Sequence, residues 1–127
     1  MQLTHTALYV RDLEAMKDFY TRYFGAQANQ KYHNPRTGLQ TYFLSFRAGA
    51  RLELMTRPDL RERDDAAQTY GYTHIAFRLG SREAVDALTG VLAKAGFPAL
   101  SGPRVTGDGY YEVSLKDPEG NLLELVA

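Results

Sequence analysis

Two histidines and two glutamates of this 127-residue chain recur in matching surroundings and could together hold a metal ion. Thr4-His5-Thr6-Ala7-Leu8 returns 69 residues later as Thr73-His74-Ile75-Ala76-Phe77, and Leu52-Glu53-Leu54 returns 71 residues later as Leu123-Glu124-Leu125. Imidazole and carboxylate groups suit a divalent ion such as Zn, Ni, Mn, Co or Fe. The chain has no cysteine, which excludes thiolate ligands and disulfides. The repeated pairs therefore predict one site formed by His5, Glu53, His74 and Glu124.

The alternation of side chains along a strand explains how these four residues could face the same way. His5 and His74 share one strand face with small alanines, and the apolar residues beside them form the other face, which a helix should cover. Glu53 and Glu124 each stand between two leucines, so both point away from the helix-packed face. Taken singly, such a glutamate is usually solvated and such a histidine is usually structural. The coincidence in both copies favours a metal site.

Each copy continues from its histidine strand into an amphipathic helical pattern. The first helix should begin after Asp12 and end at Gly25, and the second should begin after Ser81 and end at Gly96. Further strands are expected at 28–32, 40–46 and 51–55, and again at 99–100, 110–116 and 121–126. Ser45 also matches Ser114 at a separation of 69, which places the two additional residues of the second copy in the turn at 117–120.

The predicted fold class is therefore α+β, with two repeated β-α-β-β-β units whose mixed, mainly antiparallel sheets curve around a central metal site. The first unit should span about 1–57, a charged linker about 58–70 and the second unit about 71–127, as a single domain. Two copies of one unit can face each other, so that equivalent residues converge.

Composition narrows the choice of partners and compartment. The net charge is zero, with 15 basic and 15 acidic residues and no basic helix face, so we expect no nucleic-acid partner. No apolar run approaches 18 residues, so no membrane span is expected. The first residues lack the pattern of a signal peptide, which, with the absence of cysteine, favours the cytoplasm. Neither a nucleic acid nor a membrane is therefore expected as a partner.

Three further side chains are candidates for lining a pocket beside the predicted site: Tyr9, Arg78 and Tyr110. Arg78 shares the strand face of His74 and could reach an anionic group, although an ordinary surface arginine is the alternative. Tyrosines on or beside strands can line a pocket or belong to the core. His33 adjoins Asn34 and Pro35 in a turn, and we expect it to be exposed and to take no part in metal binding.

The two ends of the chain, taken with His74, resemble the vicinal oxygen chelate superfamily, which includes glyoxalases, bleomycin resistance proteins and extradiol dioxygenases. The resemblance covers essentially the whole chain and is carried by Thr4-His5-x-Ala7-Leu8-x-Val10-x-Asp12-Leu13, Phe19-Tyr20-x-x-Tyr23-Phe24-Gly25 and Asp117-Pro118-Glu119-Gly120-Asn121-Leu122-Leu123-Glu124-Leu125. It implies the ligand set already derived, and a fourth ligand at Glu53 is most similar to glyoxalase I. The chain departs from glyoxalase I at 54–59, where an Asn-Trp-Gly-like stretch is absent, so the substrate stays open.

The resemblance implies lyase or isomerase chemistry of the lactoylglutathione lyase kind. One divalent metal binds two adjacent oxygens of a small carbonyl substrate, and a carboxylate moves the neighbouring proton. Glu124 is the expected base and Glu53 the second candidate, with His5 and His74 as fixed ligands. Two alternatives are a non-catalytic, antibiotic-sequestering protein of the bleomycin-resistance type and an Fe(II) extradiol dioxygenase. A homodimer is expected, with each site closed within one chain or across a twofold interface.

Overall fold

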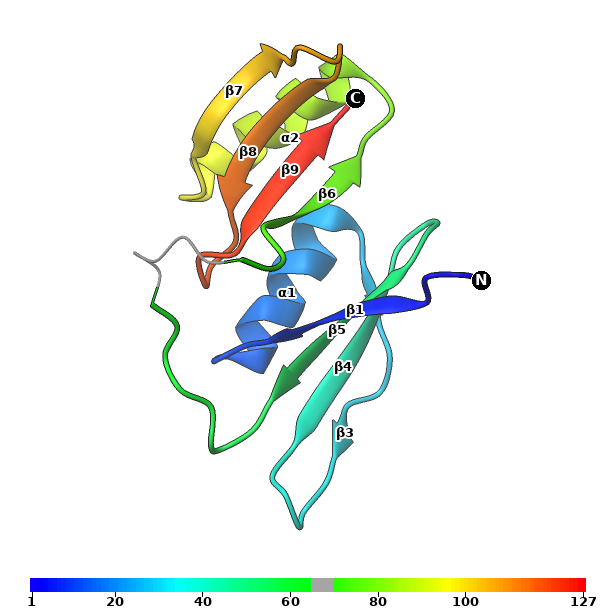
Figure 1. Cartoon of the computed structure of the whole chain (residues 1–127), viewed down its shortest axis with the longest axis vertical. Coiled ribbons are helices and arrows are strands. Elements are labelled where there is room, and N and C mark those ends of the chain that lie inside the picture. Colours follow the sequence, from blue (N-terminus) through cyan, green and yellow to red (C-terminus); the bar gives the residue numbers. More distant parts are fainter. Residues whose placement is uncertain (65–69) are drawn as a thin grey trace. The chain divides into compact units, whose positions relative to one another are not determined.

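The chain forms two compact units of the same construction, Met1–Asp64 and Asp65–Ala127, each with one helix and one mixed sheet (Figure 1). The computed structural model describes residues 1–64 and 70–127. Residues 65–69, which belong to the predicted linker at about 58–70, lie outside the described residues. The α+β class and the repeated β-α-β-β-β plan are confirmed.

The sheet of the first unit has the strand order β1-β5-β4-β2, with β3 also paired to β4. Its elements are β1 (His5–Tyr9), α1 (Leu13–Phe24), β2 (Gln27–Ala28), β3 (Tyr32–His33), β4 (Gln40–Ser45) and β5 (Arg51–Thr56). Strands β1 and β5 are parallel, and the other pairs are antiparallel. The parallel pair places the first strand of the unit beside its last, and α1 connects β1 to β2 at the opposite edge of the sheet.

The second unit repeats this arrangement with the strand order β6-β9-β8-β7. Its elements are β6 (His74–Arg78), α2 (Arg82–Lys94), β7 (Ala99–Val105), β8 (Tyr111–Lys116) and β9 (Leu122–Val126). Strands β6 and β9 are parallel, and the remaining pairs are antiparallel. The strands that carry the predicted ligands are therefore direct neighbours in each unit.

The core of each unit lies between its helix and one face of its sheet. In the first unit Leu52 and Leu54 are almost fully buried, as is Met16 of α1, which packs on β4 and β5. In the second unit Leu123 and Leu125 are fully buried on β9, which packs against α2. Burying a leucine contributes about 1.5–3 kcal/mol, so each leucine pair fixes which way its strand faces. The glutamate between each pair is thereby turned to the uncovered face, as expected.

The helix ends follow the capping residues that the sequence contains. The Asp12 side chain accepts a hydrogen bond from the Ala15 amide at 2.9 Å, and α1 stops at Gly25 with φ +65°. The Ser81 hydroxyl accepts from the Ala84 amide at 3.2 Å, and Gly96 with φ +94° follows the end of α2. Both predicted starts and both predicted stops are confirmed.

Three details of the sequence-based expectation are wrong. The single strand expected at 28–32 is instead the two short strands β2 and β3. Between them the Phe43 amide donates to the Asn29 side chain and not to a backbone carbonyl, which interrupts the ladder. The short strand expected at 99–100 extends to Val105 as β7. It passes Pro103 through shifts in register, which an edge strand permits.

The third correction concerns the alignment of the two copies. Phe43 is opposite Glu53, and Ser114 is opposite Glu124, so Phe43 and not Ser45 occupies the position of Ser114. The links β4–β5 and β8–β9 are equally long, because residues 46–50 and 117–121 separate the strands. The two additional residues of the second copy therefore lie before β8, and not in the turn at 117–120.

Across the described residues, no helix has the length and apolar character needed to cross a membrane.

Candidate metal centre

The second unit brings His74 and Glu124 together on the uncovered face of its sheet. In the parallel β6–β9 pair, Ala76 lies opposite Glu124, and His74 is two residues earlier on the same face. The methyl group of Ala76 leaves room for both larger side chains. His74 Nε2 and Glu124 Oε2 are 3.1 Å apart, and the two side chains are 36% and 17% exposed. The pair is accessible from solvent while its carboxylate is mostly covered.

The first unit repeats this arrangement with His5 and Glu53. Ala7 lies opposite Glu53 in the parallel β1–β5 pair, which is the register of Ala76 and Glu124. His5 Nε2 and Glu53 Oε2 are 3.7 Å apart, with the side chains 39% and 14% exposed. Within each unit the structure thus unites the histidine and the glutamate that the sequence predicts to be ligands.

A threonine hydroxyl contacts the other ring nitrogen of each histidine. Thr4 Oγ1 and His5 Nδ1 are 2.9 Å apart, and Thr73 Oγ1 and His74 Nδ1 are also 2.9 Å apart. A hydroxyl that accepts from Nδ1–H leaves the Nε2 lone pair facing the glutamate, which is the tautomer that a metal ligand needs. The sequence reasoning missed this role. The recurring Thr-His dipeptide was the signal that could have found it.

The pairs fit a divalent ion by their chemistry and spacing. Two ligands at about 2.1 Å from one ion, seen from it at roughly 90–110°, lie about 3.0–3.4 Å apart. The separation of 3.1 Å in the second unit falls in this range, and that of 3.7 Å in the first approaches it. Within neither unit does the described chain gather three histidine, aspartate or glutamate side chains for a metal. Each unit thus offers two ligands, and the four-residue set needs both pairs.

The surroundings of the two pairs differ although their backbone register does not. The His5 ring meets the Phe43 ring edge-on, with centroids 5.3 Å apart and planes at 83°. The corresponding neighbour of Glu124 is the small, buried Ser114. The first pair therefore lies beside an aromatic ring and the second beside a hydroxyl group.

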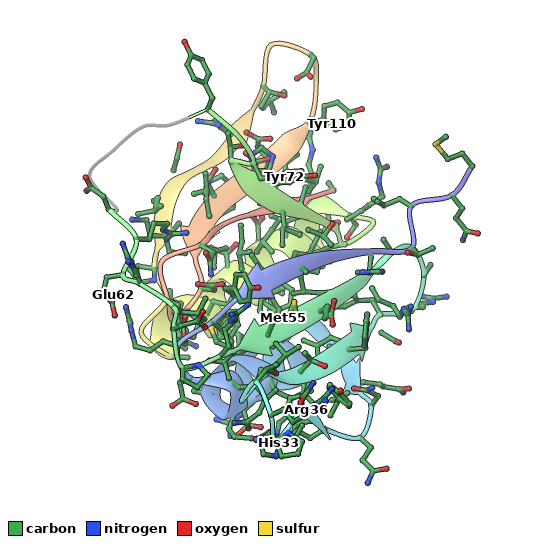
Figure 2. The ribbon with its side chains drawn as sticks, turned by 60° about the horizontal axis from the view of Figure 1, so that its bottom comes forward. His33, Arg36, Met55, Glu62, Tyr72 and Tyr110 are labelled. Carbon is green, nitrogen blue, oxygen red and sulfur yellow. The ribbon has the colours of Figure 1, made fainter. Side chains whose placement is uncertain are left out.

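A pocket of about 460 Å³ opens beside Glu124, and all of its lining residues belong to the second unit. They are Ala76, Arg78, Thr106, Asp108, Tyr110, Glu112, Glu124 and Val126. Two of the three predicted substrate-contact residues, Arg78 and Tyr110, thus line one pocket with the expected base. Figure 2 shows Tyr110 in the β7–β8 hairpin. The third, Tyr9, lies in the first unit at the position that Arg78 has in the second, and it is 54% exposed.

Glu112 is a pocket residue that the sequence reasoning did not single out. It is 8% exposed, and its Oε1 accepts from Arg104 Nε at 3.1 Å and from Arg104 Nη2 at 2.7 Å. Arg104 Nη1 also donates to the Ser101 hydroxyl at 2.8 Å. Arg104 therefore neutralises and fixes one of the acidic groups in the pocket wall. Sequence spacing gave no signal for this pair, because it depends on the irregular β7–β8 register.

His33 is exposed, as the sequence predicts, and projects from the β3–β4 hairpin (Figure 2). Its register partner is Gln40, whereas Thr41, the partner of Met55, has the opposite orientation. His33 therefore does not share the sheet face of the His5–Glu53 pair.

Residues 2–125 match the family model described as the Glyoxalase/Bleomycin resistance protein/Dioxygenase superfamily. The chain belongs to this superfamily. Uncharacterized protein PA2024 of Pseudomonas aeruginosa is 34% identical over 126 residues, covering 96% of this chain and 85% of that protein. Uncharacterized protein YqjT of Bacillus subtilis is 29% identical over 130 residues, covering 97% and 96%. The fold is also similar to that of the trypanothione-dependent glyoxalase I of Leishmania major. That comparison gives a TM-score of 0.79 at 23% identity over 99% of this chain and 86% of that one. Superfamily membership confirms the resemblance and leaves the activity to be argued from the site.

Proposed function

We propose that the chain is a glyoxalase-like metalloenzyme that moves a proton between neighbouring atoms beside a carbonyl group, as a lyase or isomerase. The observation that carries the proposal is the repeated triplet of threonine hydroxyl, imidazole and carboxylate, built twice in one register. His5, Glu53, His74 and Glu124 would hold one divalent ion such as Zn, Ni, Mn, Co or Fe. Such an ion would supply Lewis-acid polarisation of the substrate carbonyl.

We assign the base to Glu124, because it lines the pocket in which a small carbonyl compound has room. Its carboxylate takes the proton from the carbon beside the carbonyl, and the C–H electron pair moves toward the carbonyl oxygen. The same carboxylate returns the proton to the carbon that carried the carbonyl. A hydroxyl on the first carbon becomes the new carbonyl as its proton passes to the former carbonyl oxygen, so no oxidant or reductant is needed. Glu53 is the second candidate for this role.

Metal analysis of the purified protein tests the centre. We expect close to one divalent ion per chain in the wild type. That ion should be lost in His5→Ala and in His74→Ala. His33→Ala is the matched control and should retain the ion, because His33 is exposed on a separate face. If the wild type neither contains nor takes up any ion, the enzyme assignment fails and a ligand-sequestering protein of the same superfamily becomes the explanation.

Turnover of hemithioacetals of 2-oxoaldehydes tests the base. These substrates are chosen because the Leishmania major structure is of a glyoxalase I, and other thiols and α-carbonyl compounds form the rest of the panel. Glu124→Gln should lower kcat by at least about 10²-fold while the metal content changes little. If Glu53→Gln produces that loss and Glu124→Gln does not, the two roles are exchanged. Oxygen consumption with a catechol would point to the dioxygenase alternative.

The two pairs can meet within one chain or across a homodimer, and complementation separates these arrangements. We propose a homodimer, as expected for related proteins. If sites form across the interface, mixing His5→Ala with His74→Ala gives heterodimers with one intact site, and activity returns. If each site forms within one chain, the mixture stays inactive.

A further inference from the structure

We infer that Arg78 is the anchor for an anionic group of the substrate, so that the pocket selects carbonyl compounds carrying a carboxylate or similar anion. This inference rests on the proposed function for the identity of the reacting group. It begins from the pocket of the second unit, where Arg78 and Glu124 are both lining residues. Ala76 lies opposite Glu124 and Arg78 lies opposite Val126, so the arginine is two residues further along the same face.

The charged side chains of the pocket differ in whether they are already engaged. Glu112 is held by Arg104, Asp108 accepts from the Thr106 hydroxyl, and Glu124 faces His74. Among the described residues, Arg78 has no hydrogen-bond or ion-pair partner, and its side chain is exposed. A guanidinium group carries five donors in a planar fork that matches a carboxylate or phosphate. Its donors are thus available to an incoming anion.

The fold does not require an arginine at this position. The corresponding residue of the first unit is Tyr9, which has the same register relative to its glutamate strand. Since the β-α-β-β-β unit also forms with tyrosine there, the folding of the strand does not depend on the charge of Arg78. Because Arg78 lines the pocket, we assign its charge to the binding of an anion there.

The distance along the strand indicates where the anion would be on the substrate. Two residues of a strand correspond to about 6.6 Å, and the long arginine side chain can shorten this separation. An anion a few bonds from the reacting carbonyl could therefore contact Arg78 while that carbonyl lies beside Glu124. Tyr110 and Thr106 place further hydroxyl groups in the same pocket wall.

A matched pair of chelating probes tests the inference without requiring turnover. The first probe is succinic acid monohydroxamate, and the second is the same molecule with its carboxylate replaced by a primary amide. Both present the two adjacent oxygens of the hydroxamate, and only the first carries a negative charge at the other end. We expect the wild type to bind the carboxylate probe about tenfold more tightly, as measured by NMR titration or calorimetry. Arg78→Met should abolish this preference, and Arg78→Lys should retain part of it. Arg36→Met, which removes an exposed arginine from the β3–β4 turn (Figure 2), should keep the full preference.

The titrations are performed with the metal-loaded and the chelator-treated protein, so that the two proposals fail separately. Equal affinity of the wild type for both probes, or a preference that survives Arg78→Met, overturns the anion anchor even if metal binds. Preference for the carboxylate in a protein that takes up no metal supports the anchor and contradicts the proposed metalloenzyme. Circular dichroism of Arg78→Met establishes that it is folded, and Arg78→Gln replaces it if it is not.

Discussion

Replacing Thr73 with valine removes the hydroxyl that contacts His74 Nδ1 while leaving the shape of the side chain almost unchanged. Partners of this kind fix the tautomer and direction of a metal-binding imidazole, and losing one weakens metal binding about 10- to 100-fold. The His74 side chain is 36% exposed, so water can replace part of the lost contact. We therefore expect the low end of the range, an increase in Kd of about tenfold, which corresponds to about 1.4 kcal/mol.

Competition with a chromophoric chelator measures this change for Zn or Co. The control is Thr89→Val, which is the same substitution in the same unit, at a hydroxyl that donates to the Val85 carbonyl within α2. It should leave the affinity for the metal within about twofold of the wild type. Thr4→Val should behave like Thr73→Val, because its hydroxyl is also 2.9 Å from Nδ1 of its histidine. Unchanged affinity in both threonine variants would refute the argument that these hydroxyls orient the ligands.

Three further predictions concern stability. Leu123→Ala should lower the free energy of unfolding by about 2–5 kcal/mol in urea titrations, because this side chain is fully buried and its loss leaves a cavity. Gly102→Ala should lower the free energy of unfolding by about 1–3 kcal/mol, since φ is +90° and a Cβ atom would lie 2.6 Å from the Glu112 carbonyl oxygen. A urea midpoint equal to that of the wild type would contradict this prediction. Hydrogen bonding to Lys17 lowers the pKa of Glu14 from 4.5 to about 2. Its contribution is under about 1 kcal/mol, because the side chain is half exposed, and it is present above pH 4.5 and lost as the pH falls through 2. Glu14→Gln should therefore be less stable than the wild type at pH 5, and the difference should be clearly smaller at pH 2.

The sequence was sufficient for the two-unit fold and for the direction of the predicted ligand side chains, because both depend on simple periodicity. A histidine beside a small alanine and a glutamate between two leucines can face one way only, once the leucines are buried under a helix. The register of β8 could not be obtained in this way. Ser45 and Ser114 share a residue type, but the hydrogen-bonded ladder aligns Phe43 with Ser114.

The periodicity of the sequence also could not predict the pocket. Its wall includes Asp108 and Glu112, whose positions depend on how β7 passes Pro103 and shifts register against β8. Tyr110 was named as a candidate because it is an aromatic residue near a strand, and Arg78 because it shares a face with His74. What the sequence could not supply was the pairing of Glu112 with Arg104. Among the residues that the structure describes, Arg78 is a pocket cation without a hydrogen-bond or ion-pair partner.

The differences between the two units bear on the role of the two histidine–glutamate pairs. If each histidine and glutamate were present for the stability of its own sheet, their neighbours should match, since a structural role depends on local packing. Two neighbours on the uncovered face instead differ, although Ala7 and Ala76 match: Phe43 in one unit corresponds to Ser114 in the other, and Tyr9 corresponds to Arg78. The threonine, the histidine and the glutamate are the same in both units, and each histidine contacts its threonine and its glutamate. Because the surrounding side chains differ, a shared packing requirement does not explain why these three residues are the same. The metal centre proposed above would explain why these three residues are shared, and a substrate with chemically different parts would explain why the other positions diverge.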